Sequence, residues 1–139
     1  MKPKTFNYDR LIKSEDLNHH KTLFAGRCAE WFVEAGLIAA ASVLPAANVV
    51  CLKVHGFLFT EPMVAGEIAC FKSRIVKVGR TSLTTYISLT PQNKLDPIIS
   101  GFITFVHVND EGKSQPHGIE LELDTEEDYR LYQQALALN

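Results

Sequence analysis

One segment constrains the fold of this chain more than any other. Residues 23–44 are apolar almost all round a helix, yet they carry two carboxylates, Glu30 and Glu34. At 100° per residue, Arg27, Glu30 and Glu34 share an arc of about 60°, and Pro45 ends the predicted helix. A helix of this kind has to be covered on most of its sides. A charge among apolar neighbours is costly unless it is paired or used, so we look for chemistry here.

The rest of the chain favours strands. A short strand is predicted over residues 6–13, and a polar loop over residues 14–21 leads from it to the helix, where Thr22 or a residue after it is the expected N-cap. Four longer strands with turn sequences between them are predicted after the helix, over residues 48–59, 67–78, 82–89 and 97–108. A short helix begins near residues 124–127, whose acidic side chains suit a helix N-terminus. One helix followed by a run of strands indicates an α+β fold, in which an antiparallel sheet curls round the helix.

Composition and length narrow the class of protein further. The 14 basic and 16 acidic residues leave a net charge of -2, so no overall field recruits nucleic acid or an anionic membrane. Three cysteines without a CxxC pair indicate reduced, packed thiols and a cytoplasmic location. We find no apolar N-terminal signal, and the longest apolar run is too short to span a bilayer. We therefore expect one domain over residues 1–139, and a homodimer, since one sheet covers only one side of the helix.

Several sequence blocks occur in a specific order along residues 8–112. They are Asp16-Leu17-Asn18, Phe24-Ala25-Gly26 with the helix through Glu34-Ala35-Gly36, the segment FTEPMVAGE at 59–67, VGRTS at 78–82, and FITFVHVNDEG at 102–112. In this order the blocks resemble the hotdog-fold acyl-CoA thioesterases. The resemblance implies a homodimer, often assembled into a trimer of dimers, with thioester sites at the subunit interface. It implies an acyl-CoA substrate that is hydrolysed to free acid and CoA without a metal or an organic cofactor.

The chemistry of thioester hydrolysis directs attention to the start of the helix. The reaction needs a carboxylate base or nucleophile and a donor that polarises the carbonyl, and backbone N–H groups at a helix N-terminus can be that donor. Gly26 suits this position because a missing Cβ lets the carbonyl come close. The family's acid falls at Val33, which cannot do acid–base work, and Ala25 replaces the first glycine of the family's pair. Glu34 follows Val33, but a shift of one residue turns a side chain by about 100° round the helix.

Three interpretations of Glu34 stay open. It is the working base, acting with Asn18 and His20 of the facing subunit, or a structural carboxylate paired with Arg27 or a loop group, or a solvated charge. Glu30 is expected to form an ion pair with Arg27.

The loop residues also have two interpretations each. Asn18 matches the family's loop asparagine, which orients the carbonyl or the water, and otherwise it forms an Asx turn. His19 and His20 are a substitute base or surface residues without a role, since imidazole titrates near neutrality. Neither the histidines nor the scattered cysteines have the spacing of metal ligands.

The VGRTS block supplies the candidate CoA-binding residues. Arg80, Thr81 and Ser82 match the block that lies near the CoA phosphates in such folds, and the alternative is a turn with an exposed arginine. Nearby basic residues, Lys72, Arg74 and Lys77, add local positive charge that suits a CoA ligand. Trp31 and Phe32 are expected in the core or at an interface.

Three functions are compatible with these patterns. The first is an acyl-CoA thioesterase. The second is a non-catalytic acyl-CoA-binding or regulatory hotdog protein that kept the pocket and lost the acid at Val33. The third is a dehydratase or hydratase of 3-hydroxyacyl thioesters, which Asp16-Leu17-Asn18-His19-His20 partly resembles and against which VGRTS argues.

Overall fold

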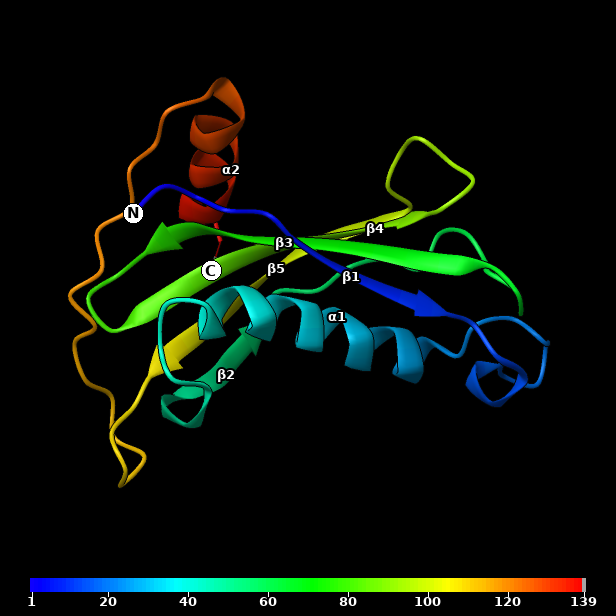
Figure 1. The fold of residues 1–139 in the computed structure, drawn as a ribbon, viewed down its shortest axis with the longest axis horizontal. Coiled ribbons are helices and arrows are strands. Elements are labelled where there is room, and N and C mark those ends of the chain that lie inside the picture. Colours follow the sequence, from blue (N-terminus) through cyan, green and yellow to red (C-terminus); the bar gives the residue numbers. More distant parts are fainter. Residues whose placement is uncertain (139) are drawn as a thin grey trace.

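The structure is a computed structural model that describes residues 1–138, and it contains one five-stranded antiparallel sheet (Figure 1). The strands run in the order β1-β3-β4-β5-β2 across this sheet. The elements are β1 (Phe6–Leu11), α1 (Ala25–Ala41), β2 (Val49–Val54), β3 (Ile68–Val78), β4 (Ser82–Pro91), β5 (Ile99–His107) and α2 (Glu126–Leu136), with short 3-10 helices at Ser14–Asp16 and Ala46–Asn48. The predicted α+β class and the order of one helix followed by four strands are confirmed.

Helix α1 packs on one face of the sheet and forms the core with it. Trp31 and Phe32 are at most 1% exposed, as predicted. Seven residues of the helix are buried: Cys28, Trp31, Phe32, Ala35, Gly36, Ala39 and Ala40. The alternation predicted along residues 82–89 places four side chains of β4 in the same core, namely Leu83, Thr85, Ile87 and Leu89. Gly36 lets β4 approach the helix, because a Cβ there would lie 3.0 Å from the Thr85 Oγ1.

The predicted ends of two elements are wrong, in each case because of a local backbone contact. Helix α1 begins at Ala25 with Phe24 as N-cap, not Thr22, and it ends at Ala41 instead of Leu44. At that end the hydroxyl of Ser42 donates to the Ala39 carbonyl at 2.6 Å, which closes the last turn. Strand β2 ends at Val54 instead of Phe59, and Gly56 follows it with a φ of 97°, in the region that favours glycine.

Helix α2 lies against the other face of the sheet (Figure 1). Its residues Leu131 and Ala135 pack on Val76 of β3, with Tyr86 and Phe102 beside them.

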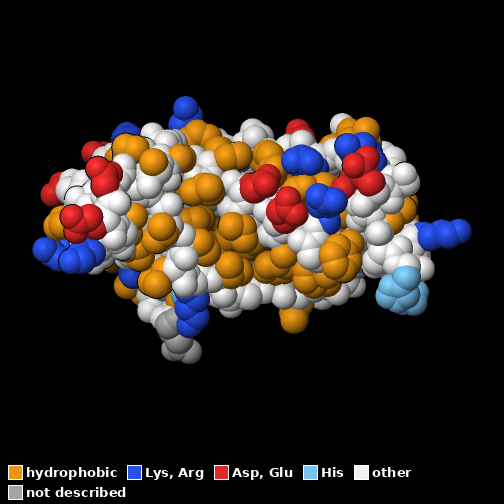
Figure 2. All heavy atoms as spheres, turned by 90° about the horizontal axis from the view of Figure 1, so that it is seen from below, with side chains coloured by type: hydrophobic (Ala, Val, Ile, Leu, Met, Phe, Trp, Pro, Cys, Tyr) orange, Lys and Arg blue, Asp and Glu red, His pale blue; other side chains and the backbone are white. Residues whose placement is uncertain are grey.

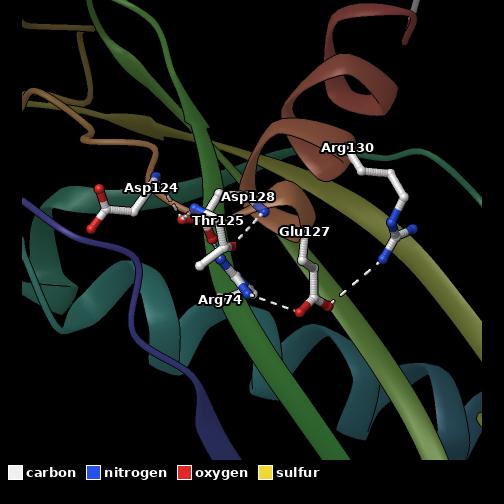
Figure 3. Close-up of polar contacts among 6 residues, drawn as sticks. All are labelled: Arg74, Asp124, Thr125, Glu127, Asp128 and Arg130. Atoms are coloured by element: carbon white, nitrogen blue, oxygen red, sulfur yellow. Dashed lines mark hydrogen bonds and ion pairs between the residues drawn. The ribbon is translucent and has the colours of Figure 1, made fainter.

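The first turn of α2 is anchored to β3 by a buried ion pair (Figure 3). Arg74 donates to Asp128, and Thr125 caps the same turn by accepting from the Asp128 backbone N–H at 3.0 Å. The expectation that Arg74 adds free positive charge for CoA is therefore wrong, since two carboxylates of α2 already neutralise it.

The three cysteines differ in their surroundings. All are free thiols, and Cys28 is buried while Cys70 is partly buried. The expectation of three packed thiols is wrong for Cys51, which is exposed on β2, an edge strand of the sheet. Among the described residues, no helix has both the length and the apolar character needed to cross a membrane.

Gly101 is expected to be a sensitive core position. A Cβ there would lie 2.8 Å from the Gly56 carbonyl oxygen and 3.2 Å from the Phe32 ring, and backbone cannot move aside cheaply. We expect Gly101→Ala to lower the free energy of unfolding by about 1–3 kcal/mol through overpacking. Urea denaturation measures this, with Ser100→Ala, an exposed neighbour in the same strand, as the control. Equal stability of the two variants would contradict the prediction.

Candidate active site

A pocket of about 290 Å³ opens at the N-terminus of α1. Its polar wall residues are partly or fully exposed and mark its mouth: Asn18, Thr22, Thr60 and Glu61. Its buried wall residues are apolar or nearly so and mark its floor: Cys28, Met63, Leu89 and Ile99. Burial raises the pKa of the Cys28 thiol to about 12, so this group stays neutral. A pocket with an apolar floor and a polar mouth suits a ligand that has a hydrocarbon part and a polar reacting group.

Asn18 fixes the loop that forms one side of this mouth. Its Oδ1 accepts hydrogen bonds from the backbone N–H groups of His20, at 2.8 Å, and Thr22, at 3.2 Å. Its Nδ2 donates to the Thr22 hydroxyl at 3.0 Å. Lys21 takes a φ of 62° within this tight loop. The predicted Asx-turn geometry is therefore present, and the same side chain also lines the pocket.

The first turn of α1 presents unused donors beside the loop. The N-cap is Phe24, whose side chain cannot accept a hydrogen bond, and the first bond of the helix runs from the Cys28 N–H to the Phe24 carbonyl at 3.0 Å. The N–H groups of Ala25, Gly26 and Arg27 accordingly have no partner within the helix, and they lie at the positive end of its dipole.

Ala25 and Gly26 lie at the pocket end of this turn. Ala25 lines the pocket, and the exposed Gly26 is the next residue of the same turn. A Cβ on Gly26 would lie 2.6 Å from the Phe24 ring, so glycine lets that ring fold back over the turn.

Glu34 lies on another flank of α1, where it faces β1. It accepts a hydrogen bond from the Tyr8 hydroxyl, to which Arg10 Nη1 donates at 2.8 Å. Burial raises the pKa of Tyr8, and the hydrogen bond to Glu34 raises it further. This geometry corresponds to a paired carboxylate, but its partner is Tyr8 and not the Arg27 that the sequence suggested. Arg27 instead pairs with Asp16 at 3.2 Å and with Glu30 at 3.8 Å, so the predicted Glu30–Arg27 pair is confirmed.

The other predicted site residues are not brought together in one protomer. His20 is exposed, and its ring contacts the ring of His19 at a tilt, with the ring centroids 4.0 Å apart. Val33 is half-buried and packs against the core. The turn with Arg80, Thr81 and Ser82 lies at the opposite end of the sheet from the start of α1 (Figure 1). Because Ser82 begins β4 and the pocket residue Leu89 is near its end, the two are roughly 23 Å apart along the strand.

The carboxylate at the mouth of the pocket, Glu61, was not among the sequence-based candidates. Glu61 lies in the 59–67 block, and its Oε2 pairs with Lys94 Nζ at 3.2 Å. Hydrogen bonds on both sides of Glu61 hold the segment, among them those from Thr60 Oγ1 to the Ile98 carbonyl at 3.2 Å and from the Leu23 N–H to the Met63 carbonyl at 2.8 Å. A carboxylate next to Pro62, in a block already matched to the family, was the available signal.

Comparisons with known proteins bear on the family and the fold of this chain. The family model described as the thioesterase superfamily matches residues 20–97, while no curated protein matches. A hexameric acyl-CoA thioesterase, solved in its apo form, is 27% identical, with a TM-score of 0.85 over 96% of this chain and 86% of that one. An acyl-CoA hydrolase from Staphylococcus aureus, solved with butyryl coenzyme A, coenzyme A and coenzyme A disulfide, is 25% identical, with a TM-score of 0.80 over 95% of this chain and 79% of that one. A hexameric thioesterase from Yersinia pestis is 25% identical, with a TM-score of 0.71 over 78% of this chain and 91% of that one.

Proposed function

Because the chain belongs to the thioesterase superfamily, as its hotdog fold and sequence blocks predicted, we propose that it hydrolyses acyl-CoA thioesters to a free acid and CoA. The observation that carries the proposal is the pocket, which joins an apolar floor to the free N–H groups at the start of α1. A butyryl-CoA ligand is bound by the S. aureus hydrolase, whose fold this chain shares. The reaction needs no metal or organic cofactor in this proposal, since CoA belongs to the substrate.

Each part of the pocket has its own role in the proposed reaction. The acyl chain lies against the buried floor residues, and the carbonyl oxygen points to the first turn of α1, where the N–H groups near Gly26 stabilise the developing negative charge. Asn18 orients the carbonyl or the attacking water from the facing loop. Water attack then releases the CoA thiol at the open, polar mouth.

The absence of the family's acid at Val33 favours the non-catalytic alternative. Solved variants of the S. aureus hydrolase replace an asparagine and an aspartate by alanine, and these two residues are fifteen positions apart in that protein. Asn18 and Val33 have the same separation here, which supports Val33 as the position of the family's acid. A protein that binds acyl-CoA without hydrolysing it is therefore the second candidate function. For the thioesterase function, the bases predicted from the sequence stay Glu34 and His20 of a facing subunit.

Self-association is part of the proposal. Two of the neighbours described above are hexameric, and we infer a dimer as the basic unit here. Hydrophobic side chains cover much of the face on which α1 and β2 lie (Figure 2). Several exposed apolar residues belong to β2 and the segment after it: Val50, Leu52, Val54, Leu58 and Phe59. A second copy on this edge covers them, and it brings Arg80, Thr81 and Ser82 of one subunit toward the other's CoA.

Thiol release from acyl-CoA substrates of increasing chain length tests the function. We expect hydrolysis by the wild type and a loss of about 100-fold in kcat/KM for Asn18→Ala, the size seen when one oriented donor is removed. Asn18→Asp is the matched variant, because it keeps an acceptor for the loop N–H groups but lacks the side-chain N–H donor. Full activity of Asn18→Asp would show that Asn18 only holds the loop. Binding of acyl-CoA without any thiol release would establish the non-catalytic function.

A further inference from the structure

The pocket contains a carboxylate for which the resemblance offers no role. We propose that Glu61 is the general base of this site, so that it replaces the acid that is missing at Val33. The assignment rests on the proposed thioester hydrolysis and goes beyond it by naming the group that activates water.

Glu61 occupies a position that suits a general base. Glu61 lines the same pocket as Asn18 and Ala25, so the carboxylate, the loop amide and the start of α1 surround one space. A wider groove of about 660 Å³ shares Thr60, Glu61 and Ile98 with that pocket and continues over the loop at 94–98. Glu61 thus stands where the pocket meets open solvent, and its side chain is 49% exposed. Water can reach the carboxylate while a thioester lies beside it.

The other candidate groups suit the role of a base less well. Within the described part of the chain, Glu61 is the only carboxylate in the wall of the pocket. Glu34 accepts the Tyr8 hydrogen bond on the flank of α1 that faces β1, and His20 is exposed with its ring against that of His19. The thiol in the wall, Cys28, is buried and neutral.

Contacts with the loop after β4 hold Glu61 at the mouth of the pocket. Lys94 pairs with Oε2 at 3.2 Å, which keeps the side chain at the mouth and leaves Oε1 for a water molecule. Thr60, the preceding residue, is tied to the Ile98 carbonyl. These contacts join Glu61 to the loop after β4 and give it a fixed place beside the pocket.

In the proposed reaction Glu61 first accepts a proton and then returns it. The Glu61 carboxylate takes a proton from water, and the hydroxide oxygen bonds to the thioester carbon, while the carbonyl electrons move to an oxygen that the N–H groups of α1 stabilise. Collapse of this intermediate breaks the C–S bond, and the sulfur leaves with the electron pair and receives the proton from Glu61. One water and one acyl-CoA give one carboxylic acid and one CoA thiol.

Steady-state hydrolysis of the best acyl-CoA substrate tests the assignment with two matched variants, Glu61→Gln and the control Glu15→Gln, whose carboxylate is exposed, pairs with Lys13 at 3.5 Å and lies outside the pocket. Both remove one negative charge and keep the size of the side chain. We expect Glu61→Gln to lower kcat by about 100-fold or more with little change in KM, as for a lost general base, and Glu15→Gln to keep kcat within about threefold. Added formate is expected to restore part of the rate of Glu61→Ala, because it supplies a carboxylate base. No such rescue is expected if the role of Glu61 is only structural.

The outcomes separate this assignment from the proposed function. An active wild type together with a Glu61→Gln variant that keeps its kcat overturns the assignment alone, and a large loss in Glu34→Gln instead makes Glu34 the base. A wild type that releases no thiol from any acyl-CoA overturns both.

Discussion

Leu52→Glu is expected to convert the protein to monomers and to remove most of its acyl-CoA hydrolysis at the same time. Leu52 is 67% exposed at the middle of β2, an edge strand, and its neighbours Val50 and Val54 are exposed as well. An edge strand with a row of apolar side chains is a template for pairing with another chain. A carboxylate placed in that interface has no partner, and burying an unpaired charge costs several kcal/mol.

The size of the effect follows from that cost. A two-fold dimer contains two copies of the substitution, so a penalty of about 3 kcal/mol for each copy weakens the dimer by more than about 10⁴-fold. Micromolar protein therefore dissociates if the wild-type Kd is in the nanomolar range. Light scattering after size exclusion measures the mass, and thiol release at the same concentration measures the activity. Activity is expected to fall with the mass, because Arg80, Thr81 and Ser82 are too far from the pocket of their own protomer to hold its CoA.

The other edge of the sheet provides the control. Leu11 of β1 is 54% exposed, so Leu11→Glu makes the same chemical change on a comparable side chain. Its strand carries Asp9 and Arg10, and charged residues are a common protection of an edge against pairing. We expect Leu11→Glu to keep the mass and activity of the wild type. Unchanged mass for Leu52→Glu, or full activity of its monomers, would rule out β2 as the interface that completes the site.

The fold was predictable because its signals are local. Alternation along residues 82–89 specifies one face of β4, and the apolar character of residues 23–44 specifies the helix that covers it. The ends of elements were less predictable because contacts from elsewhere in the chain set them. The entry to α1 is fixed by hydrogen bonds from Leu23 to Met63 and from Phe24 to Asp16, and the first of these partners lies in a distant segment.

In the candidate site, too, the residues that are close in the sequence were predictable and the long-range partners were not. Asn18 and the start of α1 are neighbours in the sequence, and the family blocks located them together. The partner of Glu34 is Tyr8, 26 positions earlier, and the partner of Arg74 is Asp128, 54 positions later. Spacing along one helix suggested Arg27 for Glu34 because it cannot reveal which strand faces the carboxylate. Glu61 was passed over for the same reason, since only the folded chain places it beside Asn18.

The second large effect concerns the buried pair that holds α2. Asp128→Asn is expected to lower the free energy of unfolding by about 3 kcal/mol, because it leaves the Arg74 guanidinium buried without its closest counter-charge. The side chains of Arg74 and Asp128 are only 14% and 6% exposed, and Arg74 Nε is buried with no hydrogen-bond partner. Hydrogen exchange of α2 and urea denaturation measure the change, and α2 is expected to lose protection first, since few contacts besides Leu131 and Ala135 hold it.

Glu127→Gln is the control: its ion pair with Arg74 is longer, at 3.8 Å, and 57% of the Glu127 side chain is exposed, so we expect a loss of less than about 1 kcal/mol.

The pH dependence of this pair gives an independent check. Burial alone raises the pKa of Asp128, but hydrogen bonds from the backbone N–H groups of Asp124 and Thr125, from Arg74 and from the Thr125 side chain outweigh it and lower the pKa from 3.8 to about 2. A carboxyl whose pKa is lower in the folded state stabilises the fold fully above its unfolded pKa and loses that contribution as the pH falls through the folded one. The stability difference between wild type and Asp128→Asn is therefore expected to be constant between about pH 5 and 7 and to shrink from about pH 4 to pH 2. A difference that persists unchanged at pH 2 would mean that the charge of Asp128 does not hold α2 on the sheet, and that packing alone anchors the helix.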